Sequence, residues 1–224
     1  MQSLPGNKAS DGLSAANVRQ ASAKLALVTI VGIALYIVID VIAQLLPPHY
    51  NPITQAESDL AVGPYGYLMT INFVIRGVLS LALLIGFMKN TSASERSQAG
   101  LVLLGIWAVG AFLLALFPTD IPGSGHATLH GRIHLLVAFI AFVSVAIGEL
   151  LLSLRFSMDE RWRSMRTPAL TIASLTLIAL VLPFAGPFIG LGSIGGVLER
   201  LFLGLALLWI LLVALRLRSH SISN

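Results

Sequence analysis

Three of the five histidines fall in one polar stretch, "GHATLHGRIH", which joins two apolar segments. Their spacing of four residues places His130 and His134 on one helix face, where two imidazoles can bind one metal ion. His126 lies a further turn back, where Gly123 and Gly125 disfavour a regular helix. Imidazole with carboxylate suits zinc, whose bound water would be the nucleophile of a hydrolase, although the glutamate of the H-E-x-x-H motif is absent. The alternative is that these histidines only form hydrogen bonds with water, lipid headgroups or loop carbonyls. The carboxylates that could complete a metal site are Glu57, Asp59 and Asp120.

A second group of polar residues lies inside apolar segments. An ionisable side chain in hydrocarbon costs several kcal/mol unless it is paired or hydrated. Arg76 is therefore predicted to have a counter-ion, for which Asp40 and Glu199 are the candidates. Such a pair either holds helices together or lines a pocket that binds an anionic group, such as a lipid phosphate or a carboxylate. The candidate ligand-binding residues are Asp40, Asn72, Arg76, Glu199 and Arg200.

The elements that must position these residues are apolar helices. The chain of 224 residues is 56% hydrophobic and only 11% charged, too little charge for the surface of a soluble domain. Six of its segments are long enough to cross about 30 Å of hydrocarbon as helices. We therefore predict an all-α, polytopic membrane bundle of six transmembrane helices. The segments are approximately residues 25–46, 65–88, 99–117, 130–154, 168–187 and 196–217.

Basic residues are concentrated in alternate connections. They precede the first segment, lie between the second and third and between the fourth and fifth, and follow the sixth. The positive-inside rule therefore predicts a cell-membrane protein with both termini in the cytoplasm. Residues 25–218 would form the helical domain, with a mobile tail over residues 1–24 and a short tail over 219–224. An alternative for the first tail is an interfacial helix over residues 14–24. Because the basic residues serve orientation, no nucleic-acid partner is predicted.

Several motifs are excluded or reinterpreted. The chain has no cysteine, which excludes disulfides and thiolate metal sites. The segment "GLGSIG" (residues 190–195) matches a dinucleotide-binding pattern, but it follows no predicted strand. We interpret it as a turn that permits close helix approach. The sequence contains no serine-hydrolase elbow and no P-loop.

Three segments resemble the DUF998 family of six-span bacterial and archaeal membrane proteins. They are "ESDLAVGPYGYLMTINFVIRGVLSLALLIGF" (57–87), "LFPTD" (116–120) and "GGVLERLFLGLALLWILLVALRL" (195–217). The resemblance covers most of residues 30–218 and implies a membrane bundle with an outward-facing polar cluster, without an assigned activity. The family pattern would be carried here by Ser58 and Asp59, Asn72, Phe117 and Pro118, one of the three histidines, and Glu199 with Arg200.

Three functions fit these observations. The preferred one is a binding role, in which an outward-facing polar pocket holds a lipid headgroup, a small ligand or a partner membrane subunit, with membrane lipids as expected partners. The first alternative is a metal-dependent, zinc-type hydrolase at the outer leaflet. The second is a small proton-coupled transporter, suggested by Asp40, Arg76 and Glu149 at different depths. The binding role is preferred because no recognised catalytic motif is present.

Overall fold

The computed structural model describes residues 6–121 and 123–222, with side chains for residues 16–221 apart from 122 and 187. All regular secondary structure in these residues is helical. Six of the helices are long and apolar enough to cross a membrane. The predicted fold class and number of spans are thereby confirmed. The six helices are α1 (Gly6–Leu45), α2 (Gly66–Asn90), α3 (Gln98–Leu116), α4 (Leu129–Arg155), α6 (Arg166–Ala185) and α7 (Gly195–Ile222). The short elements are α5 (Glu160–Arg163) and the 3₁₀ helices η1 (Glu57–Ala61), η2 (Phe156–Met158), η3 (Gly186–Ile189) and η4 (Gly192–Ile194).

Prolines and side-chain caps set the helix ends nearest the polar residues. α1 ends just before Pro47 and Pro48, which cannot donate the backbone hydrogen bonds of a continuing helix. α4 begins where the Thr128 side chain accepts a hydrogen bond from Gly131 N at 3.0 Å. Pro183, in contrast, lies inside α6. These ends leave three connections at one end of the bundle, over residues 46–65, 117–128 and 186–194.

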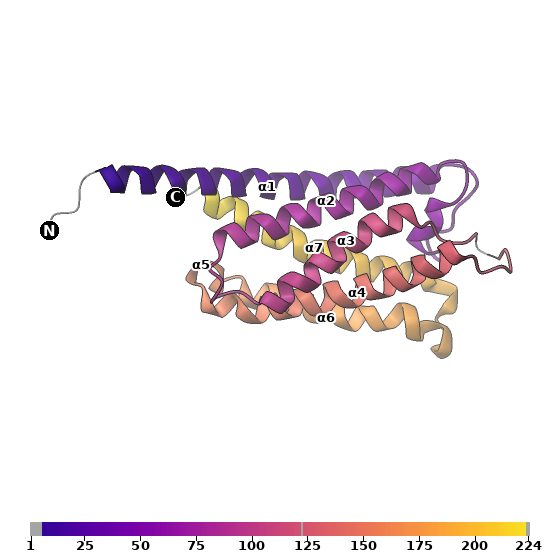
Figure 1. Cartoon of the computed structure of the whole chain (residues 1–224). Coiled ribbons are helices and arrows are strands. Elements are labelled where there is room, and N and C mark those ends of the chain that lie inside the picture. The colour runs from indigo at the N-terminus through magenta and orange to yellow at the C-terminus, as the bar shows by residue number, and fades with distance from the viewer. Residues whose placement is uncertain (1–5, 122, 223–224) are drawn as a thin grey trace.

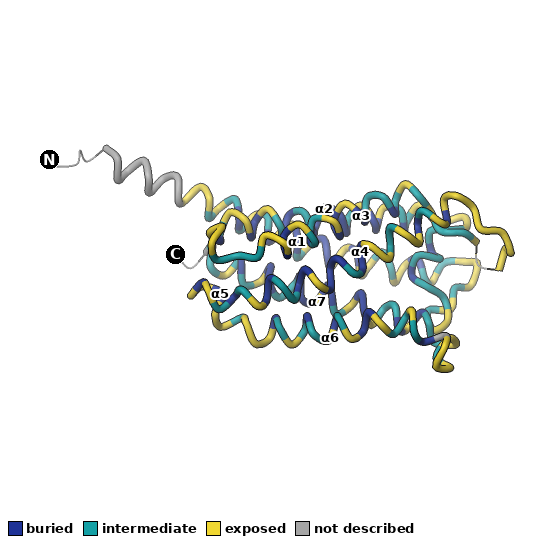
Figure 2. Tube along the Cα trace, turned by 60° about the horizontal axis from the view of Figure 1, so that its bottom comes forward, coloured by how far each residue is buried: buried dark blue, intermediate teal, exposed yellow. Residues whose placement is uncertain are grey.

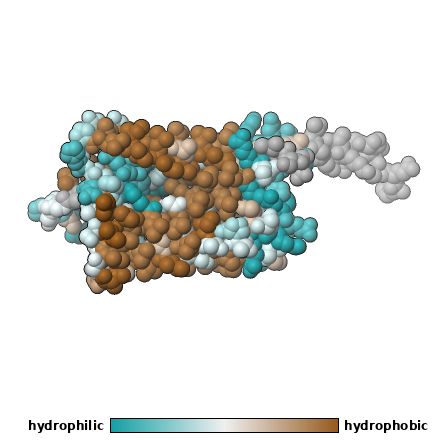
Figure 3. Space-filling view, turned by 180° about the vertical axis from the view of Figure 1, so that it is seen from behind, coloured by the Kyte–Doolittle hydropathy of each residue, from teal (hydrophilic) through white to brown (hydrophobic). Residues whose placement is uncertain are grey.

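The six long helices form a ring in chain order, in which α1, α2, α3, α4, α6 and α7 pack each beside the next and α7 packs against α1 (Figure 1). Each long helix alternates between buried residues and exposed ones along its length, as expected for helices with one face toward the ring and one face outward (Figure 2). The face seen in Figure 3 is mostly hydrophobic between two hydrophilic ends, and hydrophilic residues reach into it from one of these ends. A bilayer requires this arrangement, because its core can solvate neither charges nor unpaired backbone groups.

The first and last helices are longer than the sequence predicted. α1 begins at Gly6, so residues 6–24, predicted as a tail or as an interfacial helix from residue 14, continue the first membrane helix. α7 continues to Ile222 and so includes most of the predicted C-terminal tail. The physical reason is helix propagation, since adding good helix formers such as alanine, arginine and lysine to an existing helix costs little. Residues 1–5 and 223–224 lie outside the described residues.

The end of the bundle that carries α5 is called the α5 end below. Contacts of Arg161 join its connections to each other and to α7. This side chain forms the two ion pairs of the described residues, with Asp159 at 2.7 Å and with Glu95 at 3.9 Å. Its carbonyl oxygen accepts a hydrogen bond from Arg216 Nη2 of α7 at 2.8 Å. The opposite end, with the three longer connections, is called the loop end.

The predicted orientation places the α5 end in the cytoplasm and the loop end outside, and the absence of native cysteine permits a direct test. Ala93, between α2 and α3, and Ser124, between α3 and α4, are both exposed. On intact cells we expect a membrane-impermeant maleimide to label Ser124→Cys and not Ala93→Cys. Both variants should be labelled after lysis. Labelling of Ala93→Cys alone on intact cells would reverse the orientation.

Candidate functional site

The connection between α1 and α2, residues 46–65, folds over the loop end of the ring and is called the lid below. Arg200 of α7 holds it in place. Its Nη1 donates to the carbonyl oxygens of Pro52 at 3.3 Å and Gln55 at 3.1 Å, and its Nη2 donates to Tyr50 Oη at 2.6 Å. Arg200 was predicted to bind a ligand, but these contacts direct its terminal nitrogens to the lid.

Gly196 allows the lid to approach α7 closely. A Cβ atom at this position would fall on the carbonyl oxygens of Pro52 and Gln55, the same oxygens that accept hydrogen bonds from Arg200. A Cβ atom at Gly204, further along α7, would meet no neighbouring atom within 4 Å. The close approach inferred for the glycine-rich segment is therefore made by the glycine that directly follows it.

We expect Gly196→Ala to destabilise the protein by about 1–3 kcal/mol, because the new methyl group must push the lid away from α7. Gly204→Ala is the matched control on the same helix. It should leave the free energy of unfolding within about 1 kcal/mol of the wild type, or raise it, because alanine favours the helix. Thermal unfolding in detergent measures both. Equal effects of the two substitutions would contradict the close packing of the lid.

Beneath the lid, the ring encloses a cavity of about 170 Å³, called the Arg76 cavity below. The lid, α2, α3, α4, α6 and α7 all contribute to its wall. The wall is apolar toward α6 and toward most of α4, and it is polar toward the lid, α7, Arg76 of α2 and His134 of α4. Of the predicted ligand-binding residues, Arg76 and Glu199 line the cavity. The other polar side chains in its wall belong to Glu57, Ser58 and His134.

Arg76 is buried without an ionic partner. Its side chain is only 1% exposed, its Nε and Nη2 lack a hydrogen-bond partner among the described residues, and it takes part in neither of their ion pairs. The predicted pair with Asp40 or Glu199 is therefore not formed. Instead, the guanidinium carbon lies 4.5 Å from the ring centroid of Trp107 and 5.1 Å from that of Phe73. Cation–π attraction to these rings offsets part of the cost of burying the charge.

Glu57 is fixed at the top of the cavity by contacts with two membrane helices. Its Oε1 accepts a hydrogen bond from Tyr36 Oη at 2.6 Å, and its backbone N donates to Glu199 Oε2 at 3.2 Å. Asn72 Nδ2 donates to the carbonyl oxygen of Tyr36 at 3.1 Å and so supports the same corner. Asn72 and Asp40 are not in the cavity wall, although Asp40 lies close enough to Glu57 to affect its charge.

The carboxyl group of Glu57 holds its proton unusually strongly. Burial, reinforced by the negative charge of Asp40, raises its pKa from 4.5 to about 8. At neutral pH this side chain is therefore mostly uncharged. Its Oε1 accepts the hydrogen bond from Tyr36, so the carboxyl group stays fixed at the lid side of the cavity.

We expect the stability of the protein to fall as the pH rises from about 5 to 8. In this window the folded state keeps a proton on Glu57 that the unfolded chain has released. Glu57→Gln can keep both hydrogen bonds but does not titrate, so it should gain stability relative to the wild type by up to about 1.4 kcal/mol per pH unit. Unfolding midpoints across this range measure the difference. Glu160→Gln, at an exposed position, is the control and should follow the wild type; a Glu57→Gln curve parallel to both would contradict the assignment.

The histidine segment forms the start of α4 and the connection before it. His134 Nδ1 donates to Phe117 O at 2.8 Å, His130 packs edge-on against the Phe117 ring at 5.5 Å, and His126 is exposed. Asp120 accepts hydrogen bonds at 3.1 Å and 2.6 Å from the threonine that caps α4. Within residues 6–121 and 123–222, no three acidic or histidine side chains form a group that could hold a metal ion. Zinc binding therefore stays a prediction.

A family model connects this arrangement with known proteins. The model described as "Protein of unknown function (DUF998)" matches residues 30–216, most of the chain. The chain belongs to the DUF998 family. No curated protein and no solved structure matches it. This DUF998 member is an integral membrane protein with six spans.

In this DUF998 protein, residues that carried the resemblance gather at the loop end. Ser58 and Glu199 line the Arg76 cavity, and Arg200 holds the lid over it. Asp59 Oδ2 accepts a hydrogen bond from the backbone N of residue 56 at 3.1 Å and so stabilises the turn of the lid. Among the three clustered histidines, His134 alone is part of the cavity wall.

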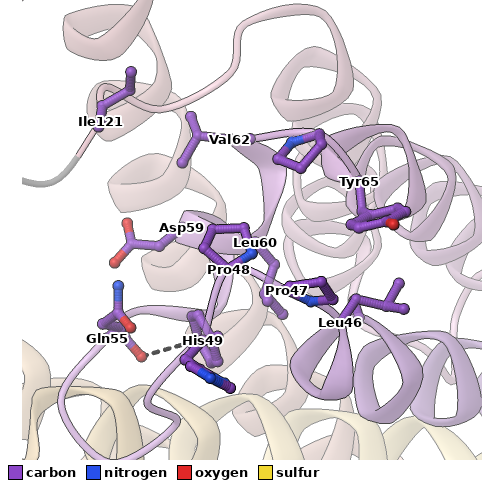
Figure 4. A pocket seen from close by; sticks show the side chains of 14 residues that line it. Leu46, Pro47, Pro48, His49, Gln55, Asp59, Leu60, Val62, Tyr65 and Ile121 are labelled. Carbon is purple, nitrogen blue, oxygen red and sulfur yellow. Dashed lines mark hydrogen bonds between the residues drawn. The ribbon is translucent and has the colours of Figure 1, made fainter.

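A second pocket of the DUF998 protein, with a volume of about 290 Å³, is lined by the lid, by Ala43 at the end of α1 and by Ile121 (Figure 4). His49, Asp59 and Tyr65 are among its wall residues. Burial raises the pKa of Asp59, but its carboxyl group is already engaged within the lid. None of the described buried side-chain atoms that lack a hydrogen-bond partner belongs to this pocket. The Arg76 cavity is therefore the stronger candidate site of the DUF998 protein.

Sequence reasoning missed three parts of the site. Glu57 was considered only as a metal ligand, whereas it forms the top of the Arg76 cavity. Tyr36 could have been found, because it lies four residues before Asp40 and shares its helix face. Trp107 gave no signal, since it is one apolar residue within a fully apolar helix.

Proposed function

We propose that this protein binds the oxyanion, a carboxylate or phosphate, of a membrane-associated ligand in the Arg76 cavity. The supporting observation is a guanidinium that is 1% exposed, lines a cavity and has two nitrogens without a partner. An unpaired charge is costly to bury. A bound oxyanion would accept both hydrogen bonds at once, in the bidentate geometry that the planar guanidinium favours.

The competing role for Arg76 is purely structural. An arginine that only held helices together would be expected to pair with an acid on a neighbouring element. Glu57 and Glu199 line the same cavity, yet neither forms an ion pair with Arg76. The space between the cation and the two acids favours a ligand group as the missing partner.

The proposed site lies at the loop end, for which the positive-inside rule predicts an extracytoplasmic location. We therefore infer a cell-membrane protein, with both termini in the cytoplasm, that takes its ligand from the outer leaflet or from the extracytoplasmic side. This role requires no catalytic group.

Native mass spectrometry of the protein purified with its own membrane lipids tests the proposal. The wild type is expected to retain an acidic ligand at close to one per chain, and Arg76→Met is expected to lose it. Arg132→Met, which removes an exposed arginine at the same end of the bundle, is the matched control and should keep the ligand. Retention by Arg76→Met, or a wild type without any carboxylate or phosphate ligand, would contradict the proposal.

A further inference from the structure

The Arg76 cavity extends to the outer surface of the ring between α4 and α6. Leu135 and Phe139 of α4 and Phe184 of α6 line the cavity and are also 66%, 49% and 44% exposed. Since these residues lie within two of the membrane-spanning helices, their exposed surface faces lipid chains. The rings of Phe139 and Phe184 meet edge to face with centroids 5.4 Å apart. Two aromatic side chains therefore close a seam that leads from the membrane to the buried guanidinium.

The lid covers the same cavity at the loop end. Glu57 and Ser58 of η1 belong to its wall, and the Glu57 backbone is tied to Glu199 of α7. Arg200 adds hydrogen bonds between the lid and α7. Opening this route would break several hydrogen bonds, whereas opening the seam requires only rotation of apolar side chains. Access from the membrane is therefore the easier path.

The polar wall of the cavity offers donors and acceptors on different elements. Arg76 offers two nitrogens, Nε and Nη2, whose N–H groups have no partner. Glu199 uses Oε2 to accept from the lid, which leaves Oε1 free. His134 donates through Nδ1 to a carbonyl oxygen, which leaves Nε2 as an acceptor in the neutral ring. An oxyanion uses the donors, and an ammonium group uses the acceptors.

The volume of the cavity limits what enters it. About 170 Å³ corresponds to roughly five or six water molecules at about 30 Å³ each. This space is large enough for a small headgroup but too small for a whole lipid with its hydrocarbon chains. The chains would remain in the seam, beside Leu135 and Phe184.

We propose that the ligand is a zwitterionic amphiphile, with an oxyanion and a primary ammonium in its headgroup, that enters from the membrane between α4 and α6. This inference rests on the proposed function and names the class of ligand. The cavity wall carries the positive charge of Arg76 and, when Glu199 is ionised, one negative charge that balances it. A zwitterion preserves that balance, whereas a simple anion would add an uncompensated charge in a medium of low dielectric constant.

Nanodiscs with equal amounts of phosphatidylethanolamine, phosphatidylcholine and phosphatidylglycerol provide the test, read by native mass spectrometry. The wild type should bind phosphatidylethanolamine about tenfold more than the other two, because choline has no N–H donor and glycerol has no charge. Glu199→Gln should abolish the preference over phosphatidylglycerol.

The route is tested with substitutions on α4. Ala138→Phe fills the cavity wall at the seam and should remove the bound lipid. Leu136→Phe, at a position 60% exposed and outside the cavity wall, should retain it. Should Ala138→Phe fail to fold, Leu135→Trp at the mouth of the seam makes the same test.

The outcomes separate this inference from the proposed function. If the wild type binds the three lipids equally and Arg76→Met binds none of them, the inference of a zwitterionic ligand is overturned. Oxyanion binding by Arg76 would still be supported. Displacement of the bound lipid by an equal concentration of water-soluble phosphoethanolamine would overturn the membrane route. Unchanged lipid binding by Arg76→Met would overturn the proposed function itself.

Discussion

Replacing Arg76 by methionine is expected to stabilise the ligand-free protein by about 1–3 kcal/mol while ending ligand binding. Methionine can pack against Phe73 and Trp107, and it removes a buried charge whose Nε and Nη2 lack partners. The lost cation–π contacts, worth about 0.5–2 kcal/mol, offset part of the gain. In the ligand-bound protein we expect Arg76→Met to be destabilising instead. The substitution then removes two charge-assisted hydrogen bonds of about 1.5–3 kcal/mol each.

Thermal unfolding before and after delipidation separates the two effects of the Arg76 substitution. Arg76→Lys is the matched control, because it keeps the positive charge but replaces the planar fork by a single ammonium. It should show neither the gain in stability nor full ligand binding. Destabilisation of delipidated Arg76→Met by about 3 kcal/mol or more would instead identify Arg76 as part of a structural ion pair.

The equivalent change at Arg200 should have the opposite effect. We expect Arg200→Met to destabilise the protein by about 2–4 kcal/mol with or without ligand. Its Nη1 and Nη2 are engaged with the carbonyl oxygens of Pro52 and Gln55 and with Tyr50 Oη. Removing the guanidinium would break these hydrogen bonds, leaving Gln55 O only the one from Tyr50 Oη, and would release the lid from α7.

Unfolding midpoints and limited proteolysis of the lid measure the effect at Arg200. Cleavage within residues 46–65 should become faster in Arg200→Met, because the lid would open more often. The exposed Arg132 provides the control, and Arg132→Met should change stability by less than about 0.5 kcal/mol. Equal cleavage of wild type and Arg200→Met would show that the clamp does not hold the lid.

The six-helix architecture was predictable because it depends on the length of apolar runs, which the bilayer thickness dictates. The number of membrane crossings also indicated that the polar residues of the candidate site lie at one end of the bundle. Arg76 was recognisable as a focal residue, since an arginine within an apolar span needs a special environment. Arg76 and Glu199 line one cavity although they come from distant spans.

The contacts within the site could not be predicted from the sequence. The physical reason differs from one residue to the next. Glu57 meets Glu199 across 142 positions of the chain, through a lid whose path depends on tertiary hydrogen bonds. Trp107 lies in a helix that is apolar all round, so no periodicity indicated which face it occupies. Whether Arg76 touches an acid or an aromatic ring depends on small rotations and shifts of one helix against another. The spacing of residues in the sequence does not encode these.

The most direct test of the central claim is an experimental density map of the wild-type protein in native lipid, inspected at Arg76. The account predicts density for an oxyanion within hydrogen-bond distance of Nε and Nη2, continuous with a chain that leaves between Phe139 and Phe184. A guanidinium bound directly to Glu57 or Glu199, with no ligand density in the cavity, would contradict it.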